Sequence, residues 1–311
     1  MNNINEIQIL LTKKAELNAR LNLLPYDGTP EIKQIGGNKY LYIRKRVLNK
    51  VTSTYVDVYS DELYNLLLRN NEESKSLKKE IRKIEKELAT LGYKEGELKP
   101  QVILARDFGR KNRNLIIYNQ ALLEGINLTF LDIKEIIEKG IIKRAKTEDV
   151  QKIINLKRAW EFILDEDVLR AKTEFNLISY IAKIVNEGFY LNGGQIRGVP
   201  VKIGGSSYIP PLPIENVVKE EISNILNNKD LNDELKAIEL CLYIMKTQIY
   251  NDGNKRTAVI AANHYLVSKG VGFIAIPHTK VAKFKKMLID YYDDKDLDSI
   301  KNFLKTCINI I

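Results

Sequence analysis

Apolar residues recur every three or four positions at both ends of the N-terminal third of the chain, the spacing of one face of an α-helix. The pattern predicts helices over residues 4–24 and 61–91, and Ser60 is placed to act as the N-cap of the second. The positions that share the repeating face are Ile7, Leu10, Lys14, Leu17, Leu21 and Leu24 in the first helix and Leu63, Leu67, Leu77, Ile81, Ile84, Leu88 and Leu91 in the second. We expect the two helices to pair as an antiparallel coiled coil.

Between these helices the pattern changes to residues typical of β-strands. Residues 39–47 and 51–59 are rich in Val, Ile, Tyr and Thr, and a short segment, residues 48–50, joins them. This arrangement predicts a β-hairpin. Residues 1–96 are therefore expected to form an α+β module of helix, hairpin and helix.

From about residue 100 onward the pattern is mostly helical. Thr129 and Asp132 have the spacing of a capping box, Gly140 suits a helix end, and Thr147 is expected to cap a helix that runs through Leu164. Further helices are predicted over residues 168–187, 214–227, 232–248, 254–269, 279–290 and 295–310. Glycines and Pro200 break the helical pattern over residues 193–205, which predicts a short hairpin, and residues 210–213 form a proline corner. The fold class of residues 97–311 is thus mainly α.

Composition narrows the range of functions. The chain is 44% hydrophobic and 29% charged, which is typical of a globular protein, and its net charge of +9 permits an anionic partner without requiring one. It has neither an apolar run of the roughly 18 residues that a membrane helix needs nor a signal-peptide pattern at its start. Two cysteines, Cys241 and Cys307, cannot form a disulfide framework, so we expect a cytoplasmic protein without a membrane partner. With only His264 and His278 in the chain, a histidine-rich zinc site is not expected.

One segment, residues 248–258, combines several groups that bind phosphate. A predicted helix ends before it and an apolar helix follows, so the backbone N–H groups near Gly253 and Asn254 are expected to form an anion site at a helix N-terminus. Lys255 and Arg256 add two positive charges, and Asp252 adds a carboxylate suited to a phosphate-bound Mg²⁺. The group suits a polyphosphate, although the same residues also make an ordinary charged turn.

Residues 252–258, Asp-Gly-Asn-Lys-Arg-Thr-Ala, resemble the core motif of the Fic/Doc family. The resemblance extends over about residues 100–305. Gly194–Gly205 with Tyr208–Pro211 is similar to the family's flap hairpin and the proline corner behind it, and Leu123–Thr129 is similar to the stretch with its inhibitory motif. Asn155 and Ala159 fit the helix that usually comes next. The resemblance implies a Fic-type helical domain with a β-hairpin flap.

It also implies a reaction: transfer of AMP, or of phosphate in Doc-type members, from ATP or another nucleotide to a hydroxyl of a protein substrate. Asp252 would hold Mg²⁺ on the nucleotide phosphates, Arg256 would bind phosphate, and the amides of Gly253, Asn254 and Lys255 would form the anion hole. The flap would clamp the target by strand addition. Its candidate docking residues are Arg197, Val199, Val201, Lys202 and Ile203. A homodimer or an antitoxin-like partner would also fit such a protein.

Three positions depart from the family pattern. Gln248 stands where the family has the catalytic histidine, and an amide cannot take a proton from the attacking hydroxyl near pH 7. Val259 replaces a second arginine that captures the γ-phosphate, which favours Doc-type binding. Gln120 replaces the Ser/Thr of the inhibitory motif. Glu124 of that motif is retained, and it is expected either to pair with Lys255 or Arg256 or to cap a local helix.

Two alternatives to an active transferase follow from these departures and from the N-terminal module. The first is a catalytically silent protein that binds nucleotide and acts as a regulator or interaction module. The second is a regulator that binds nucleic acid through the hairpin, where basic and aromatic residues are interleaved. Those residues are Lys39, Arg44, Lys45, Arg46 and Lys50 with Tyr40, Tyr42 and Tyr55. A half-buried strand gives the same composition without such a function.

Overall fold

The computed structural model describes residues 2–24, 26–47, 50–93, 96–140 and 145–310. Contacts between residues divide the chain into two compact units, Met1–Glu95 and Gly96–Ile311. In the described residues, no helix is long and apolar enough to cross a membrane.

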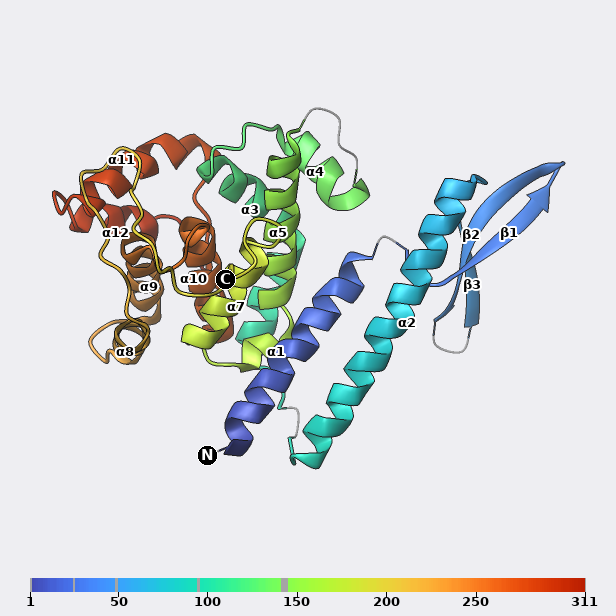
Figure 1. Cartoon of the computed structure of the whole chain (residues 1–311), viewed down its shortest axis with the longest axis horizontal. Helices are drawn as coiled ribbons and strands as arrows, with labels where there is room; N and C mark the ends of the chain where they lie inside the picture. The colour runs from blue at the N-terminus through green and yellow to red at the C-terminus, as the bar shows by residue number, and fades with distance from the viewer. Residues whose placement is uncertain (1, 25, 48–49, 94–95, 141–144, 311) are drawn as a thin grey trace. The chain divides into compact units, whose positions relative to one another are not determined.

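The N-terminal unit consists of two long helices and a three-stranded antiparallel sheet (Figure 1). Its elements are α1 (Asn2–Leu23), β1 (Thr29–Ile35), β2 (Asn38–Val47), β3 (Lys50–Val58) and α2 (Asp61–Thr90). The strand order is β1-β2-β3, so the predicted hairpin is present as β2 and β3. The sequence pattern missed β1, which contains Pro30; proline fits there because β1 is an edge strand.

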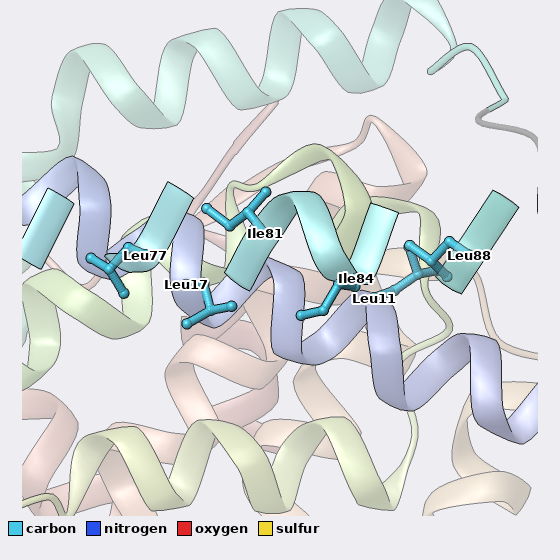
Figure 2. Packing of buried hydrophobic residues seen from close by; sticks show 6 residues of the cluster. All are labelled: Leu11, Leu17, Leu77, Ile81, Ile84 and Leu88. Atoms are coloured by element: carbon cyan, nitrogen blue, oxygen red, sulfur yellow. The ribbon is translucent and has the colours of Figure 1, made fainter. Parts of the chain in front are cut away.

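The helices α1 and α2 pack against each other in opposite directions. The ion pairs show the register, because Lys14 lies 3.7 Å from Glu85 whereas Arg20 lies 3.2 Å from Glu73. Between the helices lies a cluster of buried aliphatic side chains (Figure 2), formed by Leu11, Leu17, Leu77, Ile81, Ile84 and Leu88. Ser60 caps α2 as predicted, since its hydroxyl accepts a hydrogen bond from the Leu63 amide at 3.2 Å.

The C-terminal unit is mainly helical, as predicted (Figure 1). Its helices are α3 (Pro100–Leu123), α4 (Phe130–Lys139), α5 (Thr147–Ile163), α6 (Glu166–Arg170), α7 (Phe175–Val185), α8 (Glu215–Asn227), α9 (Asp233–Thr247), α10 (Asn254–Lys269), α11 (Val281–Tyr292) and α12 (Asp298–Lys305), with a 3₁₀ turn at His278–Lys280. A short antiparallel pair, β4 (Gly272–Ile274) and β5 (Ile308–Ile310), was not predicted. The helix α10 is buried along almost its whole length, so it forms the centre of this unit.

Two of the helix ends in this unit that were predicted from local sequence are confirmed. Thr129 and Asp132 form the predicted capping box, and Gly140 ends α4 in the left-handed conformation at φ 67°. Thr147, by contrast, is the first residue of α5 and makes no side-chain cap.

The helix predicted over residues 168–187 is broken into α6 and α7. His264, which lies fully buried in α10, contacts residues on both sides of the break. Its Nδ1 lies 2.8 Å from the Thr173 hydroxyl and its Nε2 lies 2.9 Å from the Val168 carbonyl oxygen. His264 therefore has a packing role, as a lone histidine in an apolar helix usually does.

The segment expected to be a hairpin, residues 194–205, contains no paired strands of its own. Ile196 instead forms an isolated antiparallel bridge with Tyr250, and the Arg197 amide donates to the Ile249 carbonyl at 3.0 Å. Gly194 packs so closely on α7 that a Cβ there would lie 2.3 Å from the Ser179 carbonyl oxygen. The start of the segment therefore contacts α7 and the chain before α10 instead of pairing with the rest of the segment. We call residues 195–205 the flap segment.

Candidate functional site

The turn between α9 and α10 is built on two residues in the left-handed conformation. Gln248 ends α9 with φ 50° and ψ 59°, and Gly253 precedes α10 with φ 72°. A side chain at position 253 is excluded by space as well, because its Cβ would lie 2.6 Å from Asn186 Oδ1 and 2.9 Å from Val185 Cγ1. Glycine at this position therefore lets the start of α10 lie directly against the end of α7.

The N-terminus of α10 has no side-chain cap in the described structure. The amides of its first turn, from Asn254 to Arg256, therefore keep the partial positive charge that attracts anions. Lys255 lies in the same turn, and its side chain is 38% exposed. The predicted anion hole is thus a helix start with one accessible cation.

Asn254 holds the turn together rather than facing solvent. It is buried, its Oδ1 accepts from the Tyr250 amide at 2.9 Å, and its Nδ2 donates to the Tyr250 carbonyl at 2.8 Å. The same Nδ2 lies 3.2 Å from Gln248 Oε1. The side chain of Asn254 therefore fixes both the path of the turn and the orientation of the amide at position 248.

Both ends of the Gln248 amide are engaged. Its Nε2 donates to the Met245 carbonyl at 2.5 Å and its Oε1 accepts from Asn254. Neither histidine belongs to this turn: His264 is buried in packing contacts, and burial lowers its pKa to about 4, while His278 is exposed and its ring lies against Tyr118. The position at which the motif resemblance implies a general base is thus occupied by a fixed, neutral amide.

Arg256 is turned inward, and its side chain is only 1% exposed. Its Nη2 donates to Asp252 Oδ2 at 2.9 Å, and its Nη1 donates to the Val185 carbonyl at 3.1 Å. The carboxylate of Glu124, at the end of α3, lies 3.4 Å from Arg256 Nε and 3.8 Å from Lys255 Nζ. Glu124 therefore partly neutralises both cations of the turn.

Gln120 connects this site to the core. Its Nε2 donates to the Arg256 carbonyl at 3.0 Å, and its Oε1 accepts from Trp160 Nε1 at 2.9 Å. The sequence resemblance puts it where the family's inhibitory motif has Ser/Thr. Because its amide serves a backbone carbonyl and a buried indole, its role in this chain is to support the first turn of α10.

Two buried side chains tie the flap segment and the chain just before it to the turn: Asn186, which sequence reasoning did not place in the site, and Arg197, which it placed on the docking side of the flap. The Asn186 Nδ2 donates to the Gly193 carbonyl at 3.1 Å and to the Asp252 carbonyl at 2.9 Å. Arg197, predicted as a docking residue on the flap, is instead 2% exposed. Its guanidinium donates to four carbonyl oxygens, those of Gln248 at 2.6 Å, Val199 at 2.9 Å, Pro210 at 3.1 Å and Pro211 at 2.6 Å. Burial lowers the pKa of Arg197.

The other predicted docking residues lie nearer the surface. Val199 is 57% exposed and Lys202 is exposed, whereas Val201 and Ile203 are half-buried. The flap segment therefore has an outer side that can meet another chain and an inner side that Arg197 ties to the turn.

Asp252 is the carboxylate that the turn offers to a metal. Its side chain is 47% exposed, and Arg256 occupies only Oδ2. Among the described residues there is no group of three or more His, Cys, Asp or Glu side chains able to hold a metal ion. A single accessible carboxylate fits Mg²⁺ that takes its remaining ligands from nucleotide phosphates and water.

A mainly helical unit with this turn before its central helix is a Fic-type fold, and comparisons with known proteins agree. Residues 172–266 match the profile of the Fic/DOC family, and residues 5–65 match a domain family of unknown function, DUF6788. Residues 172–266 of the C-terminal unit thus match the Fic/DOC family, as the motif predicted. The match includes the flap segment and the turn but not Glu124.

Solved structures with the same fold share few residues with this chain. Fic-1 from C. elegans (residues 134–508) is 17% identical with a TM-score of 0.54, and the match covers 80% of this chain and 74% of that one. A Fic-domain signaling protein from Bacteroides thetaiotaomicron VPI-5482 is 18% identical with a TM-score of 0.55, over 68% of this chain and 87% of that one. A Fic family protein from Desulfovibrio desulfuricans G20 is 13% identical with a TM-score of 0.51, over 69% and 75%. The comparison with curated proteins gave no match.

Proposed function

We propose that this chain binds ATP or another nucleotide at the start of α10 and transfers AMP, or phosphate as in Doc-type proteins, to a hydroxyl of a target protein. The Fic/DOC-family match supports a nucleotide-transferase-like function in general terms. The observation that supports binding at this place is the uncapped N-terminus of α10 beside Lys255, Arg256 and Asp252.

Each residue of the turn has a binding role in this proposal. The amides at the start of α10 and Lys255 bind phosphate oxygens, and the carboxylate of Asp252 holds Mg²⁺ against the phosphates. When bound, Mg²⁺ neutralises phosphate charge and so eases attack at phosphorus. Asn254 acts through the turn, because it fixes the path of the backbone that presents the amides.

Proton transfer is the weak point of the site. As the attacking hydroxyl oxygen bonds to phosphorus, the bond from phosphorus to the leaving group breaks, releasing pyrophosphate in AMP transfer or the nucleoside diphosphate in phosphate transfer. The hydroxyl also has to lose its proton, and Gln248 can accept a hydrogen bond at Oε1 but cannot take that proton. Loss of a general base typically slows such a reaction by roughly 10²- to 10⁴-fold. Positioning and charge stabilisation remain, so we propose a slow transferase.

Glu124 restrains this site in the proposal. It lies against both cations that a phosphate would approach, so nucleotide binding has to compete with an ion contact already made within the chain. The outer side of the flap segment, with Val199, Val201, Lys202 and Ile203, is the proposed docking edge for an extended segment of the target.

The fixed amide at position 248 and the buried Arg256 favour a second function. In this alternative the chain binds nucleotide but does not react, and the bound state controls an interaction with another protein. Both functions share the same nucleotide site, so they differ only in whether a group is transferred.

Calorimetry with ATP and Mg²⁺ tests the shared step, and the two ends of α10 offer a matched pair of variants. Lys255→Ala removes the accessible cation of the first turn, whereas Lys269→Ala removes an exposed lysine at the last turn of the same helix. Loss of a charge-assisted phosphate contact costs about 1.5–3 kcal/mol, so Lys255→Ala should weaken binding about 10- to 150-fold. The Lys269→Ala variant should bind like the wild type; no binding by the wild type itself would reject both functions.

Labelled nucleotides then separate the two functions. Protein labelled from ATP carrying ³²P at the α-position indicates AMP transfer, and labelling only from the γ-position indicates phosphate transfer. If neither the α- nor the γ-labelled nucleotide labels protein although nucleotide binds, the catalytically silent regulator is the function supported.

A further inference from the structure

The outer face of the β1–β2–β3 sheet carries tyrosines and basic residues that have no role in the proposed transfer reaction. One face of the sheet packs on α2, because Leu41 and Ile43 of β2 form a buried cluster with Leu67. Side chains alternate along a strand, so Tyr40, Tyr42 and Arg44 lie on the opposite face.

Strand register extends this outer face across all three strands. Tyr42 pairs with Tyr55 of β3 and with Glu31 of β1, while Tyr40 pairs with Lys33 of β1. Residues directly opposite on neighbouring strands share a face. Three tyrosines therefore lie together on the side of the sheet that faces away from α2.

The tyrosine rings form one contiguous aromatic surface. The Tyr42 and Tyr55 ring centroids are 5.6 Å apart and those of Tyr40 and Tyr55 are 6.2 Å apart. Lys33 Nζ lies 4.3 Å from the centre of the Tyr42 ring. Tyr55 is 51% exposed, so a planar group from solvent can stack on it without any rearrangement of the core.

The strands of this sheet carry a net positive charge, and on its outer face Lys33 is paired with Glu31 at 3.7 Å. Residues 29–58 hold six basic and two acidic residues, a net charge of +4 out of +9 for the whole chain. Arg44, on the outer face, is exposed and has no ion-pair partner among the described residues. The side chains of Arg46 and Lys50, also named from the sequence, lie outside the described part of the structure.

We propose that this outer face binds single-stranded nucleic acid, with an unpaired base stacked on Tyr55 and a phosphate beside Arg44. Exposed aromatic rings combined with positive charge are the means by which sheets hold single strands, since every base offers a face for stacking. In a duplex the bases already stack on one another, so the same face should prefer a single strand. DNA and RNA share this chemistry, and the test includes both.

Fluorescence anisotropy of the full chain with labelled oligo-dT and oligo-U of about 20 nucleotides measures binding, and a duplex of equal length measures the preference. Tyr55→Leu keeps an apolar side chain but removes the ring, and should weaken single-strand binding about tenfold. Tyr55→Phe keeps the ring and should stay within about twofold. Tyr190→Leu, at an exposed tyrosine of the other unit, is the matched control and should change nothing.

Salt dependence tests the charge. Affinity should fall steeply between about 50 and 200 mM salt, and Arg44→Gln should reduce the slope of the logarithmic plot by about 0.7. The Lys255→Ala variant should retain full oligonucleotide affinity, because that lysine belongs to the α10 turn. Loss of binding in this variant would place the oligonucleotide at the turn and overturn the proposal.

Other results also overturn it: equal affinities of wild type and Tyr55→Leu, a duplex bound as tightly as the single strands, or no salt-dependent binding. A second copy of this chain could also occupy this face. Light scattering, which measures the oligomeric state, tests for it. A dimer that Tyr55→Leu converts to monomer would assign the face to self-association instead.

Discussion

The guanidinium of Arg197 is predicted to be the main link between the flap segment and the turn before α10. Replacing Arg197 with methionine keeps most of the side-chain volume but removes every donor. Four carbonyl oxygens then lose a partner at once, those of Gln248, Val199, Pro210 and Pro211. The size of the effect depends on which of these carbonyls water can reach.

Val199 is 57% exposed and Pro211 is exposed, so water can replace the guanidinium at their carbonyls. Pro210 is buried and its carbonyl accepts a buried hydrogen bond, while Gln248 is half-buried. A buried carbonyl left unpaired costs about 1–3 kcal/mol, so two of them predict a loss of about 2–6 kcal/mol. Removing the charge also removes its own burial cost, which places the expected loss in the lower half of that range.

Denaturant unfolding followed by Trp160 fluorescence measures this loss, since Trp160 is the only tryptophan of the chain and is fully buried in the C-terminal unit. Hydrogen exchange gives the local effect: amides of the flap segment should exchange faster in Arg197→Met. Arg197→Lys keeps the charge but has fewer donors. Its unfolding free energy and its flap-segment exchange rates should lie between those of the wild type and of Arg197→Met. A loss below about 1 kcal/mol with unchanged exchange would show that the segment is held by other contacts.

Three further predictions concern single residues. Gln248→His restores a base at the turn and should raise labelling of target protein by roughly 10²-fold or more; a variant no faster than wild type would show that the reaction does not depend on a base at that position. Glu124→Gln removes the charge that competes with phosphate, and calorimetry should show ATP binding about tenfold tighter; unchanged affinity would exclude restraint by Glu124. The lowered pKa of His264, about 4 against the ordinary 6.5, means that the unfolded state takes up the proton first as pH falls. His264 should therefore contribute a drop in unfolding free energy of about 3 kcal/mol between pH 6.5 and 4, and the total drop measured by denaturant unfolding should be smaller by about this amount in His264→Gln.

Local chemistry explains why much of the fold could be predicted. The caps at Ser60, Thr129 and Gly140 depend on residues within a few positions of one another, and each acts as its type suggests. The same holds for the turn at Gly253, where a glycine between two helices indicates left-handed backbone. The strand β1 was missed because Pro30 and the glycines after it indicate loops, and only its pairing with β2 makes it a strand.

The roles of Arg197 and Arg256 illustrate what could not be predicted. Arginine is usually exposed, so a basic residue in a glycine-rich segment favours a surface role. Arg197 is instead held by backbone carbonyls, which residue type does not reveal. Asn186 escaped notice for the same reason, since both of its acceptors are main-chain oxygens.

Arg256 was correctly grouped with Asp252 from the motif, but its burial was not foreseen. The contacts that bury it come from Glu124 and Val185, which are distant in sequence and meet it only in the folded chain. This burial bears on how the site would work. An arginine that already contacts two carboxylates, Asp252 and Glu124, and one carbonyl gains little from phosphate unless a carboxylate moves away. Because Asp252 is the proposed Mg²⁺ ligand, Glu124 is the contact that an incoming phosphate has to displace. In the proposed function, the affinity for nucleotide should therefore depend more on the Glu124 contact than on Arg256 itself, and the more exposed Lys255 should make the first contact with phosphate.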